Sequence, residues 1–96
     1  MSTGELLEAK RQEVLHLAAE HGASNVRVFG SVARGDDLAA SDVDLLIDMA
    51  PDRSLLDHIA LLQDLQDLLG CKVDLVTEAA LHWYIRDRVL AEAVPL

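Results

Sequence analysis

Two aspartates stand two residues apart, Asp42 and Asp44, at the start of a run with alternating apolar residues. Side chains at positions i and i+2 of a β-strand point to the same face, about 6.5 to 7 Å apart along the backbone. A third aspartate, Asp74, has the same relation to its apolar neighbours in the segment KVDLV. If the two segments are adjacent strands, all three carboxylates meet.

Such a cluster of acids is unfavourable without a cation. Unit charges about 4 Å apart repel by roughly 1 kcal/mol in water and by about 4 kcal/mol at an effective dielectric of 20. Oxygen ligands of high charge suit magnesium or manganese. The sequence therefore predicts a divalent-cation site made of Asp42, Asp44 and Asp74.

A second group of residues suits phosphate. Gly30 lets the backbone approach a ligand closely, and the hydroxyl of Ser31 and the following N–H groups can hold phosphate oxygens. Arg34 can add a charge-assisted contact. Phosphate contacts beside metal ions indicate nucleotidyl or phosphoryl transfer on a nucleoside triphosphate.

The best-known phosphate loop does not fit this segment. The glycine spacing of a P-loop is present from Gly30 to Gly35, but Asp36 and Asp37 stand where that loop requires lysine and then serine or threonine. We expect these two acids to be solvated loop residues. A simpler alternative also stays open, because Asp42, Asp44 and Asp48 could be the wet face of a half-buried strand. We expect Asp48 to have a structural role only.

The elements that must position these residues follow from apolar periodicity. We expect helices over residues 4–20, 55–69 and 79–93 and strands over residues 25–30, 42–49 and 71–77. The order predicts one α/β (α+β) domain over residues 1–96, with a small mixed three-stranded sheet and helices packed on one face. The other face would carry the aspartates. Trp83 and Tyr84, in the last helix, suit the core and a partner or nucleotide surface equally well.

Composition narrows the class of protein. The 96 residues carry a formal net charge of −9, which opposes direct binding of DNA or RNA and favours a basic protein partner. The chain has one cysteine, Cys71, and no apolar run of about 18 residues that could span a bilayer. We therefore expect a soluble, cytoplasmic protein without disulfides or a membrane association.

The spacing of the polar residues resembles a known family. Gly30 and Ser31, ten intervening residues, and then Asp42 and Asp44 match the signature of the polymerase-beta-like nucleotidyltransferase superfamily. The segments GSVARG, SDVDLLI and KVDLV, in so short a chain, are similar to its minimal nucleotidyltransferase (MNT) group. The resemblance extends from about Glu5 to Pro95 and implies a nucleotidyltransferase-like fold.

The resemblance also implies roles for the residues. Gly30 and Ser31 would bind the β- and γ-phosphates of ATP, and Arg34 would contact phosphate. Asp42 and Asp44 would coordinate two Mg²⁺ ions. Asp74 would complete the metal site and assist deprotonation of the acceptor hydroxyl.

Partners follow from the same resemblance. MNT proteins of this size are commonly encoded beside a HEPN-domain ribonuclease toxin and act as its antitoxin by transferring AMP from ATP to a tyrosine hydroxyl of the toxin. Two alternatives remain: an antitoxin that inhibits by binding alone, and nucleotidyl transfer to a small molecule. The chain's size leaves little wall for an adenine base, which a partner subunit could supply.

Overall fold

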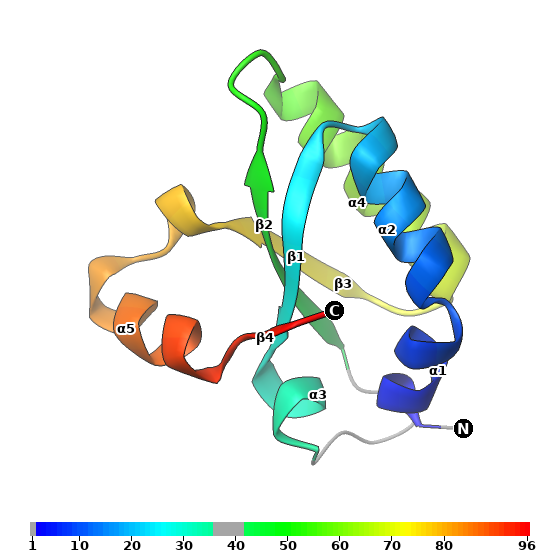
Figure 1. The fold of residues 1–96 in the computed structure, drawn as a ribbon, viewed down its shortest axis with the longest axis vertical. Coiled ribbons are helices and arrows are strands. Elements are labelled where there is room, and N and C mark those ends of the chain that lie inside the picture. Colours follow the sequence, from blue (N-terminus) through cyan, green and yellow to red (C-terminus); the bar gives the residue numbers. More distant parts are fainter. Residues whose placement is uncertain (1, 36–41) are drawn as a thin grey trace.

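The described part of the chain forms one mixed β-sheet with strand order β3-β2-β1-β4 (Figure 1). The structure is a computed structural model, and it describes residues 2–35 and 42–96. The strands are β1 (Ala23–Phe29), β2 (Val43–Met49), β3 (Val73–Thr77) and β4 (Val94–Pro95). The helices are α1 (Thr3–Ala9), α2 (Arg11–Glu20), α3 (Gly30–Arg34), α4 (Leu55–Leu69) and α5 (Trp83–Glu92), with a 3₁₀ turn, η1 (Glu78–Ala80), before α5.

The strand pairing brings the predicted acidic segments together. β2 pairs with β3 in parallel and with β1 in antiparallel orientation. α4 connects β2 to β3, as a parallel pair requires a crossover connection. The condition for the carboxylates to meet, that the strands carrying Asp44 and Asp74 be adjacent, is thus fulfilled for these two residues.

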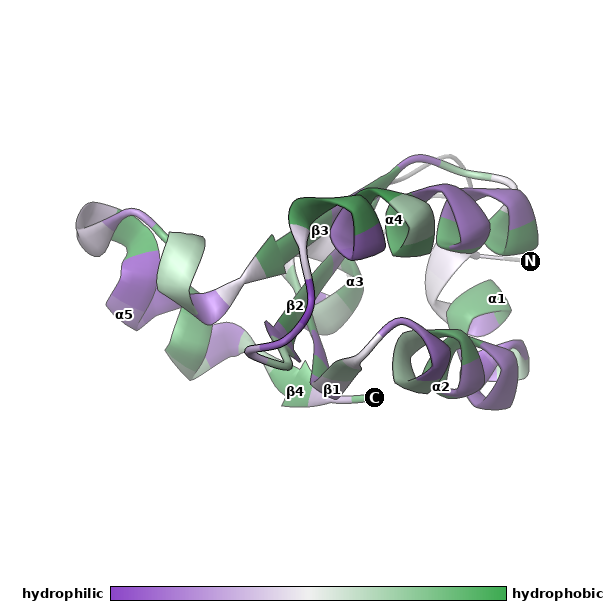
Figure 2. Cartoon of the chain, turned by 90° about the horizontal axis from the view of Figure 1, so that it is seen from above, coloured by the Kyte–Doolittle hydropathy of each residue, from purple (hydrophilic) through white to green (hydrophobic). Residues whose placement is uncertain are grey.

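The main core lies between one face of the sheet and helices α2 and α4. Strand β2 contributes Val43, Leu45 and Ile47 to it, each at most 1% exposed. Figure 2 shows α2 and α4 on the same side of the sheet. The alternation of β2 therefore turns its even-numbered residues, Asp44 among them, toward the other face.

Helix α5 lies on that other side of the sheet, across from α2 and α4 (Figure 2). Leu46 of β2 and Val89 of α5 are both buried but lie outside the main core cluster. Helix α5 thus partly covers the aspartate face, whereas the sequence predicted that all helices pack on one face of the sheet.

Three further features differ from the sequence-based expectations. The sheet has a fourth strand, β4, which pairs with β1 through Arg27 and Val28. The first predicted helix is divided at Lys10, whose φ of −102° and ψ of 12° leave the helical region. The last predicted helix begins only at Trp83, after η1. Asp36 and Asp37 lie outside the described residues.

In the described ranges no helix is both long and apolar enough to cross a bilayer.

Candidate active site

Asp44 lies at the centre of a row of residues that crosses three strands. Its register partner on β1 is Phe29, and its register partner on β3 is Asp74. Register partners on adjacent strands point to the same face, so the two carboxylates lie side by side. Asp42 precedes the strand by one residue and is exposed, as is Asp74.

The neighbouring carboxylates and partial burial raise the pKa of Asp44 from 3.8 to about 6. Burial is the largest cause, followed by the repulsion from Asp74 and Asp42 and a hydrogen bond between the Asp44 and Asp74 carboxyls. Glu92, from the C-terminal end of α5, adds a smaller repulsion. Asp44 is therefore a carboxylate that a nearby positive charge would stabilise.

The raised pKa makes a prediction about stability. A group with a raised pKa in the fold opposes folding when it is ionised, so its cost is full above about pH 6 and disappears below about pH 4. Two pKa units correspond to about 2.7 kcal/mol, and because Asp44 is partly open to solvent we expect about 1 kcal/mol. In metal-free buffer, Asp44→Asn should raise the Tm by about 4 to 8 °C at neutral pH. Thermal unfolding followed by circular dichroism at several pH values measures this, and a Tm difference that stays constant down to about pH 4 would contradict it.

The turn after β1 lies against Asp44 on the flank of β2 opposite to Asp74. Gly30 has a φ of +75°, and a Cβ added there would collide with the Asp44 carboxylate. Glycine is therefore required at position 30 for two reasons: its positive φ, and the lack of space for a side chain beside Asp44. Ser31 follows in the first turn of α3 and is partly exposed. The structure thus brings the phosphate-binding candidates Gly30 and Ser31 beside Asp44.

Arg34 has a partner that sequence reasoning missed. Its Nη1 donates to Oε1 of Glu92 at 2.8 Å. The ion pair joins the end of α3 to the end of α5, beside Asp44. No local pattern in the sequence identifies Glu92, because 58 positions separate the two residues.

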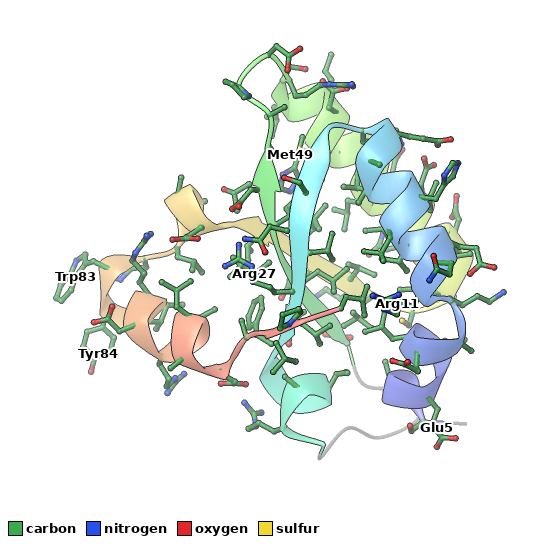
Figure 3. All side chains as sticks on the ribbon, in the orientation of Figure 1. Glu5, Arg11, Arg27, Met49, Trp83 and Tyr84 are labelled. Carbon is green, nitrogen blue, oxygen red and sulfur yellow. The ribbon has the colours of Figure 1, made fainter. Side chains whose placement is uncertain are left out.

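Asp48 has the structural surroundings that we predicted for it. Its Oδ1 accepts from Nη2 of Arg27 at 3.2 Å, and its Oδ2 accepts from the Asn25 amide at 3.1 Å. The Arg27 side chain is only 13% exposed and also pairs with Glu78 at 3.4 Å. Figure 3 shows Arg27 on the α5 side of the sheet. Asp48 thus balances a largely buried guanidinium.

The carboxylates fit a hard divalent cation as a donor set. Across residues 2–35 and 42–96, no three His, Cys, Asp or Glu side chains are grouped closely enough to hold a metal ion in their present positions. Asp44 and Asp74 are nevertheless in contact, and the mutual repulsion that raises the Asp44 pKa is what a cation would relieve. The exposed side chain of Asp42 would have to turn toward them. The three-aspartate ligand set stays a prediction.

The comparison with known proteins decides the family. A model of the nucleotidyltransferase domain matches residues 8–96. The chain belongs to the nucleotidyltransferase domain family. Because the match covers almost the whole chain, and relatives with this activity match it too, the protein is a nucleotidyltransferase, and the resemblance drawn from its sequence is confirmed.

Two relatives and two solved structures illustrate the match of this nucleotidyltransferase. The protein adenylyltransferase MntA of Thermococcus cleftensis is 40% identical over 89 residues, covering 93% of this chain and 87% of the relative. A Methanocaldococcus jannaschii protein, named provisionally as a protein adenylyltransferase, is 34% identical over 84 residues, covering 88% and 90%. A solved structure of a protein named provisionally as a minimal nucleotidyltransferase superposes with a TM-score of 0.87 at 51% identity, covering 100% of this chain and 97% of the other. A toxin-antitoxin crystal structure with AMP-PNP has a TM-score of 0.74 at 21% identity, covering 88% and 69%, and shares the fold.

Proposed function

We propose that this nucleotidyltransferase transfers AMP from ATP to a tyrosine hydroxyl of a HEPN-domain ribonuclease toxin and thereby acts as its antitoxin in the cytoplasm. The observation that carries the proposal is the alignment of Asp44 with Asp74 across β2 and β3, with the Gly30 turn against Asp44. Relatives named as protein adenylyltransferases support a protein acceptor.

Each candidate residue has a task in this reaction. The Gly30 and Ser31 turn and Arg34 hold the β- and γ-phosphates, which places the α-phosphorus near Asp42 and Asp44. Mg²⁺ bound by Asp42, Asp44 and Asp74 would neutralise the charge that develops on the phosphates. The acceptor oxygen forms a bond to the α-phosphorus, the bond to the β-phosphate oxygen breaks, and pyrophosphate leaves. Asp74 accepts the proton of the acceptor hydroxyl.

The direct test is transfer of label from α-labelled ATP to the HEPN-domain protein encoded beside this chain. We expect label on the toxin only with wild-type protein, ATP and Mg²⁺ present. An Asp42→Asn, Asp44→Asn double variant should give none. A toxin that stays unlabelled, or that is labelled equally by the double variant, would contradict the proposal.

The same double variant distinguishes AMP transfer from the alternative, in which the chain inhibits the toxin by binding alone. This alternative draws support from the exposure of Asp42 and Asp74, which residues 2–35 and 42–96 leave open to solvent. If the double variant still neutralised the toxin at equal protein level, inhibition would act through binding. We expect protection to be lost while binding persists.

The Arg34–Glu92 ion pair gives a further prediction about ATP binding. An exposed ion pair stabilises by about 0.2 to 1 kcal/mol, and ATP must compete with Glu92 for the guanidinium. Glu92→Gln weakens that competition and the repulsion of the phosphates, so the KM for ATP should fall about two- to fivefold with little change in kcat. Steady-state kinetics measures both constants. An unchanged or higher KM would show that Arg34 does not contact phosphate.

A further inference from the structure

Two large aromatic side chains lie exposed at the first turn of α5. Trp83 is 78% exposed and Tyr84 is 77% exposed, so neither belongs to the core. The Trp83 ring stacks on His82 with centroids 5.5 Å apart and meets Tyr84 edge-on at 5.8 Å. We call His82, Trp83 and Tyr84 the aromatic patch. Figure 3 shows Trp83 and Tyr84 pointing away from the rest of the molecule.

The aromatic patch belongs to the helix that stands beside the candidate active site. At its C-terminal end α5 reaches Arg34 through Glu92, whose charge also acts on Asp44. At its N-terminal end Arg86 donates to Oε1 and the backbone carbonyl of Glu78, at 2.8 and 2.9 Å. These contacts fix the helix at both ends, so the aromatic patch has a defined position relative to the carboxylates.

The length of α5, from the aromatic patch to Glu92, is within the span of a protein interface. A helix of 10 residues is about 15 Å long, and the patch and Glu92 lie at its two ends. A standard interface covers about 800 Å² of each partner, which corresponds to a disc about 16 Å in radius. A protein whose acceptor hydroxyl lies at Asp44 and Asp74 would therefore extend over α5 to the aromatic patch.

A second exposed apolar group occupies a different place. Leu55 and Leu56, at the start of α4, are 72% and 76% exposed. They lie on the helix that covers the opposite face of the sheet from α5 (Figures 1 and 2). A partner centred on the carboxylates would not contact them, which makes them a matched control for the aromatic patch.

We propose that the aromatic patch is the docking surface for the acceptor protein of the AMP transfer, an inference that rests on the proposed function. Tryptophan and tyrosine bury large apolar areas at low cost in side-chain entropy, and they dominate binding energy at interfaces. The acceptor protein presents an apolar pocket that takes Trp83, one helix length from the hydroxyl that enters the active site. Docking through α5 covers the carboxylates that the described part of the chain leaves exposed.

The test compares two double variants, Trp83→Ala with Tyr84→Ala and Leu55→Ala with Leu56→Ala. Each is purified and its affinity for the neighbour-encoded HEPN protein is measured by biolayer interferometry. We expect the aromatic double variant to bind at least a hundredfold more weakly and the leucine double variant to bind within about threefold of wild type. Equal thermal shifts with ATP and Mg²⁺ in all three proteins confirm that the fold and the nucleotide site are intact.

Other outcomes are equally decisive. Unchanged binding by the aromatic double variant overturns the proposal, as does a wild-type chain that does not bind the neighbour. A dimer of the chain alone that the aromatic substitutions disrupt would assign the patch to a second copy instead. If the patch is needed for binding but wild type transfers no label, docking stands and the AMP transfer fails, so the two claims are tested separately.

Discussion

Replacing Asp44 by asparagine is expected to reduce nucleotidyl transfer by about a thousandfold or more. The substitution preserves the size of the side chain and removes the negative charge at the point where Asp74 and the Gly30 turn converge. The loss should appear in kcat. The Asp44 carboxylate, through the Mg²⁺ that it is proposed to hold, is needed most when negative charge develops on the reacting phosphate. Transfer rates at saturating ATP and Mg²⁺ measure this effect.

The matched control for this substitution lies on the same strand. Asp48→Asn removes an acid from the same face of β2, but that acid pairs with Arg27 instead of facing the turn. We expect transfer within about threefold of wild type, and a stability loss of about 1 kcal/mol from the weakened ion pair. If both variants lost activity equally, the special role of Asp44 would be refuted.

Replacing Gly30 by alanine is expected to have the second largest effect, about a hundredfold loss of transfer. The added Cβ collides with the Asp44 carboxylate, so the carboxylate or the turn must shift from its present position. The positive φ adds backbone strain of about 1 to 2 kcal/mol. The turn proposed to bind phosphate and the carboxylate proposed to bind metal are thus disturbed together.

The variant Gly70→Ala separates the effect of backbone strain from the effect of the collision with Asp44. Gly70 also has a positive φ, +66°, but a Cβ added there meets no atom within 4 Å. We expect similar backbone strain and unchanged transfer. Urea unfolding measures the stability of both variants, and transfer assays measure their activity. A Gly30→Ala variant as active as Gly70→Ala would show that the close approach of Gly30 to Asp44 is not needed for transfer.

Period-two alternation was enough to predict the strands that carry the site. Val43, Leu45 and Ile47 alternate with Asp44, Leu46 and Asp48, which fixes the face of Asp44, and Asp74 has the same relation to its neighbours. Alternation leaves open both the adjacency of the two strands and their register, which the pairing of β2 with β3 supplies. The nucleotidyltransferase family was readable from the spacing of Gly30, Ser31, Asp42 and Asp44, although the role of each residue stays a prediction.

Other features of the fold leave no local sequence pattern from which they could be predicted. β4 consists of Val94 and Pro95, too short for any alternation to be detected. The division at Lys10 leaves the helical spacing of Leu7 and Val14 intact, and both remain buried. The position of α5 depends on Arg34–Glu92, Arg86–Glu78 and the burial of Val89, which are tertiary contacts.

The most direct measurement is the intact mass of the proposed partner, a HEPN-domain toxin, after co-expression with this chain. The account predicts a mass increase of whole AMP units with wild type and with Asp48→Asn, located by fragmentation to a tyrosine, and no increase with Asp44→Asn. An unmodified toxin that is nevertheless neutralised by the wild-type chain would contradict it.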